Sequence, residues 1–492
     1  MAKAIMLQGT MSNVGKSLLC AALCRIFRQD GLRAVPFKSQ NMALNSYITR
    51  EGLEMGRAQA MQAEAAGVEP SALMNPVLLK PTGDMGSQVI VNGEVRGNMR
   101  AAEYFRYRKS LIPEIMAAYD KLSEQADIIV IEGAGSPAEL NLKRDDIVNM
   151  GLAELTNAPV LLVGDIDRGG VFAQLIGTVK LLEEEERRRI KGLIVNKFRG
   201  DRRLFDDGVR ILEEKGGVPV VGVVPYIECD IDDEDSLSDK LCRRTADIID
   251  IAAIKLPRIS NFTDLDALAQ YEGVSVRYAE RPSELREPDM IVIPGTKNTI
   301  SDMKWLRESG FEGLIKKRIA AGTPVFGICG GYQMLGKKIS DPGNTEGGGE
   351  IRGMELLDTE TVFRTEKTRT RITGVISAQC EDFPELRGAH AEGYEIHMGE
   401  TVSNEAPLLK LTDGRTDGAY KKGIYGSYLH GIFDSAEVSH AVISELFRRK
   451  GLSAGEYISR REYKERQYDI LADAVRKSID MEMIRKIYKG EI

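Results

Sequence analysis

The sequence is poor in the residues that build metal and disulfide frameworks, and it lacks long apolar runs. Its 492 residues include four histidines, one tryptophan and six cysteines. The cysteines are scattered and none forms a C-x-x-C pair, so neither a zinc site nor a disulfide framework is indicated. No apolar run reaches the length of a membrane span, and the first residues, MAKAIMLQGT, lack the apolar core of a signal peptide. We therefore expect a cytoplasmic protein with no membrane association.

The charge balance and the length limit the classes of function and fold. The formal net charge is −7, which gives no support to a nucleic-acid binder. Strands alternate with helices in both halves, a pattern that predicts α/β domains with mostly parallel, doubly wound sheets. The length predicts more than one domain but not the oligomeric state. We expect a first domain at 1–227, a linker at 228–248, a second domain at 249–445 and a C-terminal helical segment at 446–492, in which 462–488 form one amphipathic helix.

A glycine loop with a Lys-Ser pair follows the first predicted strand, residues 4–8. The loop reads GTMSNVGKS, and a helix is expected from Leu18. In such a loop, backbone amides and the helix N-terminus cradle phosphates, the lysine reaches the β- and γ-phosphates, and the hydroxyl ligates Mg²⁺. The spacing between the two glycines is one residue longer than the strict pattern, and a plain glycine turn is the alternative. The predicted nucleotide-binding residues are Gly9, Thr10, Ser12, Asn13, Val14, Gly15, Lys16 and Ser17.

Polar residues follow several later strands of the first half. Glu132 comes directly after the strand predicted at 127–131, where a P-loop protein places an acid that organises Mg²⁺, although a solvated loop acid is the alternative. Asn196 and Lys197 follow the strand at 192–195 and match, weakly, a dipeptide that reads a purine base. Ligands bind at the carboxyl ends of strands in doubly wound sheets. The candidates after the second strand, which could equally be solvated, are Lys38, Gln40, Asn41 and Asn45.

The second half contains a candidate nucleophile in the stretch VFGICGGYQML, residues 325–335. An apolar strand ends at Cys329, and residues 332–339 are expected to begin a helix. A nucleophile on such a turn needs small neighbours, and the helix N-terminus favours a thiolate and can hold an oxyanion. We expect the oxyanion donors at Gly330 and, from the loop after the strand at 290–294, at Gly295 and Thr296. A buried structural cysteine is the alternative.

A thiolate nucleophile needs a base. His430 lies at the carboxyl end of a plausible strand and is followed by a glycine, the position that suits a catalytic histidine. His397, in GYEIHMG, is the rival candidate, and a structural role for either histidine remains open.

Many segments together resemble one family over essentially the whole length. They are LQGTMSNVGKS, PFKSQNMALNS, EMGRAQAMQAEAA, LMNPVLLKP, IEGAGSPAELNL, DIDRGGVFA, NKFRGD, PRISNFTDLDAL, IPGTKNT, GICGGYQMLG, GYEIHMG and YLHGIF. The chain resembles the cobyric acid synthase family, the glutamine-dependent amidases of cobalamin biosynthesis. Its first half is similar to dethiobiotin synthetase, whose phosphate loop has the same longer spacing, and its second half is similar to class I glutamine amidotransferases.

The resemblance implies a function and a set of roles. Cys329 would be the nucleophile and His430 its base, but the usual His-x-Glu acid is missing after His430, so the group that orients this histidine is unassigned. The substrate would be adenosylcobyrinic acid a,c-diamide, amidated at its b, d, e and g carboxylates through acyl phosphates. The resemblance implies ATP, Mg²⁺ and glutamine as ammonia donor, with no bound prosthetic group. Lys38 and three further cations would meet the substrate's carboxylates: Arg57, Lys80 and Arg168.

Three other functions compete with this one. Cobyrinate a,c-diamide synthase shares both chemistries, and only the positions of the new amides separate the two. A P-loop ATPase switch with an inert second domain usually has a second lysine early in its loop, but positions 10–12 here are Thr, Met and Ser. A non-catalytic carrier of corrinoid or nucleotide would need no nucleophile at all.

Overall fold

The computed structural model describes residues 2–83, 86–231, 246–455 and 459–492, and the chain folds as two units. Unit 1 comprises Met1–Ala43, Leu53–Asp232 and Tyr463–Ile492, and unit 2 comprises Leu44–Gly52 and Asp233–Glu462. Much of the predicted linker at 228–248 lies outside the described residues. In the described part of the chain, no helix is both long enough and apolar enough to span a membrane.

Unit 1 is built on a parallel sheet with strand order β12-β11-β10-β1-β9-β2. Its strands are apolar runs buried on both faces, as parallel strands covered by helices must be. The register sets Leu7 opposite Glu132, so the end of β9 lies beside the loop that follows β1. The strands are β1 (Lys3–Gly9), β2 (Ala34–Phe37), β9 (Ile128–Glu132), β10 (Val160–Asp165), β11 (Ile190–Phe198) and β12 (Val220–Pro225).

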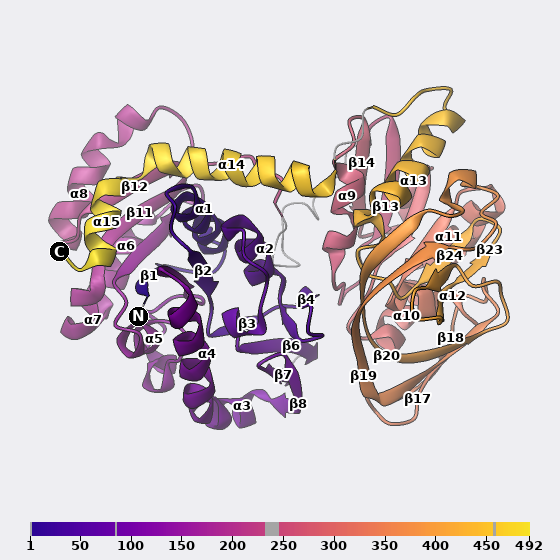
Figure 1. The fold of residues 1–492 in the computed structure, drawn as a ribbon, viewed down its shortest axis with the longest axis horizontal. Helices are drawn as coiled ribbons and strands as arrows, with labels where there is room; N and C mark the ends of the chain where they lie inside the picture. The colour runs from indigo at the N-terminus through magenta and orange to yellow at the C-terminus, as the bar shows by residue number, and fades with distance from the viewer. Residues whose placement is uncertain (1, 84–85, 232–245, 456–458) are drawn as a thin grey trace. The chain divides into compact units, whose positions relative to one another are not determined.

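Helices surround this sheet, and a smaller sheet of order β3-β6-β7-β8 follows β2 (Figure 1). The helices are α1 (Lys16–Gln29), α2 (Arg57–Ala66), α3 (Ala101–Tyr107), α4 (Ile112–Gln125), α5 (Met150–Leu155), α6 (Val171–Leu181), α7 (Glu184–Arg189) and α8 (Asp206–Gly216). The remaining strands of unit 1 are β3 (Gln40–Met42), β5 (Glu54–Gly56), β6 (Val77–Gly83), β7 (Gly86–Val91) and β8 (Glu94–Arg100).

The prediction of one helix over 462–488 was wrong, because the chain forms α14 (Arg460–Ser478) and α15 (Met481–Lys489). The break has a local cause: Ile479 bridges to Gly222, and the Asp480 N–H donates to Val221 O at 2.8 Å. The Asp480 carboxylate then caps α15 by accepting from Met483 N at 2.9 Å. The apolar faces of both helices belong to the core of unit 1, and Tyr488 packs edge-on against Phe27.

Unit 2 contains a sheet of order β14-β13-β15-β16-β24-β23, in which only the pair β23–β24 is antiparallel. The strands are β13 (Ile249–Ile254), β14 (Val274–Ala279), β15 (Met290–Ile293), β16 (Val325–Ile328), β23 (Ala419–Lys421) and β24 (Ile424–Ser427). The parallel strands place the candidate residues that follow β13, β15, β16 and β24 at one edge of the sheet. The helices are α9 (Asp266–Ala269), α10 (Thr299–Glu308), α11 (Phe311–Ala320), α12 (Gly330–Leu335) and α13 (Ala436–Arg449).

A second, mostly antiparallel sheet completes unit 2 and is dominated by the long pair β19 and β20 (Figure 1). Helix α12 ends at Leu335, and the chain enters this sheet at Lys338, so the helix expected over 332–339 is shorter and starts earlier than predicted. The strands are β17 (Lys338–Asp341), β18 (Gly349–Arg352), β19 (Thr359–Ile376), β20 (His390–Ser403), β21 (Leu409–Leu411) and β22 (Thr416–Asp417). Strand β4 (Ser46–Ile48), from the first half of the sequence, also belongs to this unit.

Candidate active sites

The loop between β1 and α1 has the tight backbone that a phosphate cradle needs. Asn13 and Gly15 have positive φ angles of 61° and 94°. A Cβ atom at Gly9 would lie 2.6 Å from Val14 Cγ2, and one at Gly15 would lie 2.3 Å from Asn196 Nδ2. Close packing therefore requires glycine at position 9, and the positive φ angle favours glycine at position 15.

Asn196 and Lys197, at the end of β11, contact the phosphate loop. Asn196 Nδ2 donates to Val14 O at 2.7 Å, and Lys197 Nζ donates to Asn13 O at 2.6 Å. Lys197 Nζ also lies 2.9 Å from a carboxylate oxygen of Asp165, at the end of β10. The sequence predicted a role for this pair in reading a base; the contacts described here go to the backbone of the loop.

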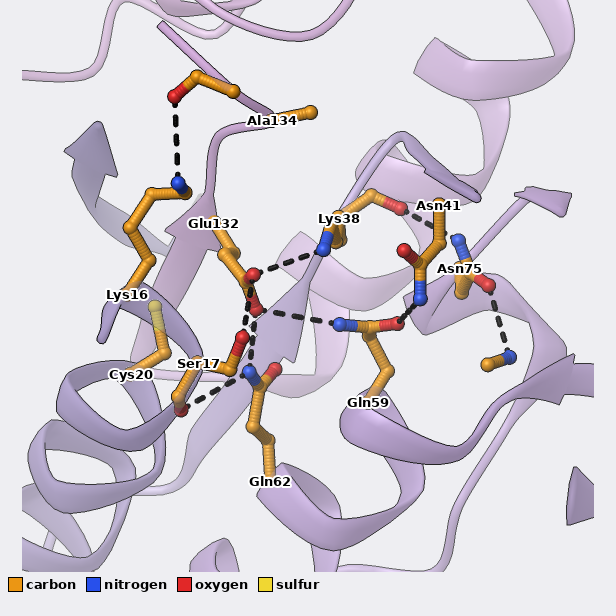
Figure 2. Close-up of polar contacts among 12 residues, drawn as sticks. Lys16, Ser17, Cys20, Lys38, Asn41, Gln59, Gln62, Asn75, Glu132 and Ala134 are labelled. Carbon is orange, nitrogen blue, oxygen red and sulfur yellow. Dashed lines mark hydrogen bonds and ion pairs between the residues drawn. The ribbon is translucent and has the colours of Figure 1, made fainter. Parts of the chain in front are cut away.

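Glu132 is the centre of a buried polar network (Figure 2). Its Oε1 accepts from Ser17 Oγ and pairs with Lys38 Nζ, both at 2.9 Å, while its Oε2 accepts from Gln62 Nε2 at 2.6 Å and Gln59 Nε2 at 3.4 Å. Burial acts to raise the pKa of the Glu132 carboxyl, but the charge of Lys38 and these hydrogen bonds outweigh it and hold the pKa below its usual value. The carboxyl is therefore ionised at neutral pH.

The residues around Glu132 fit a Mg²⁺-nucleotide. The Ser17 hydroxyl and the Glu132 carboxylate bring oxygen ligands together at the start of α1, and Mg²⁺ binds through such oxygens together with phosphates. Lys16 Nζ lies at the loop, where it donates to Met11 O at 3.1 Å and to Gly135 O at 3.3 Å. These residues would hold the metal and the nucleotide phosphates.

Most cations predicted to meet substrate carboxylates already have an acidic partner in unit 1. Lys80 and Glu54 are both buried, so the separation of that pair would break a buried ion pair. Arg168 lies in the exposed loop after β10. The pairs are Lys38–Glu132 at 2.9 Å, Lys80–Glu54 at 2.8 Å and Arg57–Glu64 at 3.7 Å.

The amide side chains after β2 divide between the two units. Gln40 and Asn41 lie on strand β3, and Gln40 Oε1 accepts from Tyr104 OH at 2.5 Å. Asn41 Nδ2 donates to Gln59 Oε1 at 3.0 Å, which connects Asn41 to the Glu132 network (Figure 2). Asn45 is buried and belongs to unit 2.

Cys329 has the strained backbone of a nucleophile on a sharp turn. Its φ and ψ angles are 51° and −107°, and it directly precedes α12. Its Sγ is 3.8 Å from Ile396 O, and its N–H donates to Ser427 O at 2.8 Å. A Cβ atom at Gly331 would lie 1.9 Å from Ile293 O, so the glycine after Gly330 is required for α12 to pack against β15.

The loop after β15 lies next to Gly330, which follows Cys329, and next to His430. Strands β15 and β16 pair directly, and a Cβ at Gly330 would lie 3.1 Å from Thr296 N. A Cβ at Gly295 would lie 3.0 Å from His430 Cε1. The Thr296 hydroxyl fixes the loop by donating to Asp302 Oδ2 at 2.5 Å. The structure thus brings together the predicted oxyanion residues and the predicted base.

His430 is buried and held by Asp264, a residue to which the sequence gave no role. His430 Nδ1 lies 2.7 Å from Asp264 Oδ2, and the Gly431 N–H donates to Asp264 Oδ1 at 3.0 Å. Burial acts to lower the pKa of His430, but the charge of Asp264 and its hydrogen bond, with a smaller contribution from Cys329, outweigh it and raise the pKa to about 10. Asp264 and His430 form a hydrogen-bonded acid–imidazole pair, and Cys329 is close enough to influence the pKa of the imidazole.

His397, the rival candidate for the base, has a different environment. Its Nδ1–H donates to Gly399 O at 2.7 Å, and its ring stacks on Tyr428 with 3.7 Å between centroids. Burial lowers the pKa of His397 to about 4, so this side chain is neutral at pH 7. Of the two histidines, His430 is the one that pairs with a buried acid and whose pKa is raised, in part by Cys329.

Comparisons with known proteins agree with this pairing of a phosphate-loop unit and a thiol-centred unit. Residues 5–237 match the CobQ/CobB/MinD/ParA nucleotide binding domain, and residues 250–438 match the CobB/CobQ-like glutamine amidotransferase domain. A cobyric acid synthase from Lachnoclostridium phytofermentans is 57% identical, with 99% of each chain covered. A cobyric acid synthase from Ruminiclostridium cellulolyticum is 56% identical, covering 100% of this chain and 98% of the relative. The chain belongs to the cobyric acid synthase family.

Asp264 lies within PRISNFTDLDAL, one of the segments that resemble the cobyric acid synthase family. No local pattern linked Asp264 to His430, because the two residues are 166 positions apart in the sequence. The available signal was an acid-rich stretch shortly after a predicted strand, at the edge of the sheet where the nucleophile and the base were expected.

Proposed function

We propose that this chain catalyses the ATP- and glutamine-dependent amidation of the b, d, e and g carboxylates of adenosylcobyrinic acid a,c-diamide. The observation that carries the proposal is the presence, in one chain, of a buried Asp264–His430 pair whose pKa responds to Cys329 and of a phosphate loop beside a buried, ionised Glu132. The whole-length identity to cobyric acid synthases supports the choice of substrate.

The glutamine reaction begins at Cys329. Its thiolate attacks the carboxamide carbon of glutamine, and the Gly330 amide with the loop at Gly295 and Thr296 stabilises the oxyanion. His430, kept protonated by Asp264, donates a proton to the departing ammonia. Water then attacks the thioester, with His430 as the base, and releases glutamate and the free thiol.

The activation of the corrinoid carboxylate takes place at the phosphate loop. A carboxylate does not react with ammonia because oxide is a poor leaving group, whereas phosphate is a good one. The substrate carboxylate attacks the γ-phosphate of ATP, the bond to ADP breaks, and ammonia displaces phosphate from the acyl phosphate. Loop amides and Lys16 stabilise the transferred phosphoryl group, and Ser17 with Glu132 would hold Mg²⁺, whose charge offsets that of the phosphates.

Mass spectrometry of the corrinoid product tests the proposal. The enzyme is supplied with ATP, glutamine and either cobyrinic acid or its adenosylated a,c-diamide. We expect four new amides on the a,c-diamide. Two amides on cobyrinic acid, at a and c, would instead assign the chain as a cobyrinate a,c-diamide synthase. ATP consumption without any change in either corrinoid would contradict the amidase function.

A further inference from the structure

A short segment from the first half of the sequence is part of unit 2. Residues 44–52 lie in the chain between two stretches of unit 1, yet they fold with the glutamine amidotransferase residues. The three residues of β4, Ser46 to Ile48, are all buried. Residues 45–49 are buried, whereas Arg50 and Glu51 are exposed, so the first part of the segment is the part that packs.

The backbone of Ser46 holds two side chains at once. Its N–H donates to Asn261 Oδ1 at 3.1 Å, and its carbonyl accepts from Tyr394 OH at 3.1 Å. Asn261 has a positive φ of 51° just before the turn that carries Asp264. The contact with Ser46 therefore fixes the direction of an amide that sits on an irregular stretch of backbone.

Both of these side chains contact His430. Asn261 Nδ2 lies 3.4 Å from His430 Nε2, the nitrogen that is not bound to Asp264. The Tyr394 ring stacks on the imidazole, with 5.4 Å between centroids and 21° between planes. Asn261 Nδ2 can donate to this nitrogen only when the imidazole is neutral with its proton on Nδ1, so this contact belongs to the state in which His430 acts as a base.

Tyr47 and Ile48, which follow Ser46, also pack against Tyr394. The Tyr47 ring lies 6.3 Å from that of Tyr394, and Ile48 forms an apolar cluster with Tyr394 and Ile396. Ile396 in turn presents its carbonyl to the Cys329 thiol. Residues 46–48 thus contact the strand that faces both the base and the nucleophile.

We propose that residues 44–52 are a positioning segment for the glutamine site, which sets the orientation of His430 through Asn261 and Tyr394. The inference rests on the proposed glutaminase role of His430. The segment is joined in sequence to Asn41 on one side and to Gln59 on the other, and both belong to the Glu132 network.

Two substitutions in the full-length enzyme test the segment. Tyr394→Phe removes the hydroxyl that donates to Ser46 and keeps the ring on His430, while Tyr47→Ala removes the ring that packs on Tyr394. Tyr420→Phe is the matched control, because its hydroxyl bonds the backbone N–H of Glu381 elsewhere in the unit. Glutamate release measures kcat and KM for glutamine hydrolysis. Corrinoid amidation with ammonium chloride as the nitrogen source measures an amidation rate that does not depend on the glutamine site.

We expect each test variant to lower kcat for glutamine hydrolysis by about tenfold, since small misplacements of catalytic groups have effects of this size or larger. KM for glutamine and the ammonia-supported rate should stay within about twofold of wild type, as should every rate of Tyr420→Phe. The double variant should lose little more than the worse single variant, because both act through one contact.

Unchanged kcat in both variants would overturn the proposal. An equal loss in the ammonia-supported rate would also overturn it, because the residues would then act through general stability. Glutamate release requires no corrinoid, so a wild-type enzyme that hydrolyses glutamine but amidates no corrinoid would contradict the proposed substrate and leave this comparison intact.

Discussion

The Glu132 centre of unit 1 and the His430 centre of unit 2 each join a buried acid to a buried base, but their partners come from different distances in the chain. Glu132 receives Ser17, Lys38, Gln59 and Gln62 from segments that precede it by 70 to 115 residues. His430 receives its partners from several separate segments, one of which precedes it by 166 residues. Both centres therefore exist only when their sheets have formed, but Ser17 and Glu132 each lie in a recognisable local motif, whereas Asp264 does not.

The two centres also differ in which protonation state the protein stabilises. In unit 1 the surrounding donors favour an ionised carboxyl, and the pKa of Glu132 falls. In unit 2 the acid and the thiol favour a protonated imidazole, and the pKa of His430 rises to about 10. A carboxylate suits the binding of a cation and phosphates, whereas an imidazolium suits the protonation of a leaving group.

Asp264→Asn should have the largest effect on the second centre. It removes the charge that holds His430 protonated, so we expect kcat for glutamine hydrolysis to fall by roughly 10²- to 10⁴-fold. Ammonia-supported amidation should remain near wild type. Asp250→Asn is the matched control, because Asp250 is also a buried acid of unit 2 but pairs with Arg277. If both variants lose glutaminase activity equally, Asp264 has no special role.

Glu132→Gln should damage the first centre alone. We expect ATP-dependent amidation to fall roughly 10²-fold with glutamine or ammonia, because a preorganised charge at the phosphates is lost. The variant should also be less stable by roughly 3–5 kcal/mol, since it breaks the buried Lys38–Glu132 ion pair. Urea unfolding measures this loss, and Glu54→Gln, which leaves Lys80 without its acid, supplies the matched value. A normal amidation rate in Glu132→Gln would remove Glu132 from the mechanism.

The raised pKa of His430 makes the stability of unit 2 depend on pH. Because the folded pKa of about 10 exceeds the ordinary 6.5, the stabilisation is complete below pH 6.5 and is lost as pH rises towards 10. The melting temperature of wild type should therefore exceed that of His430→Gln by several degrees at pH 6, and the gap should narrow by pH 10. A gap that widens with pH would show that the folded protein favours neutral imidazole.

The smallest predicted effect concerns the cap of α15, which is not part of the Glu132 centre or the His430 centre. Asp480→Ala removes the cap of α15 and should lower the free energy of unfolding by about 1 kcal/mol. Glutamine hydrolysis and amidation should both be unchanged. Asp473→Ala, on an exposed position of α14, is the control and should change stability by less than about 0.5 kcal/mol. Equal unfolding curves for the two variants would contradict the capping role.

The contrast between the centres also explains what the sequence could predict. The phosphate loop and the Cys329 turn were located because each needs glycines at fixed, local positions. Asp264 was missed because its contact with His430 depends on which strands lie side by side. The break at Ile479 was missed for the same reason, since a bridge to Gly222, far away in sequence, interrupts an otherwise regular helical pattern.

The most direct test of the account compares Cys329→Ala with Glu132→Gln, each supplied with ATP, the corrinoid and either glutamine or ammonium chloride. Product mass and glutamate release are measured together. The account predicts that Cys329→Ala forms four amides with ammonia and none with glutamine, and that Glu132→Gln still releases glutamate while amidation is strongly reduced with both nitrogen sources. Failure of ammonia to restore Cys329→Ala, or loss of glutamate release in Glu132→Gln in the absence of corrinoid, would contradict two separate centres.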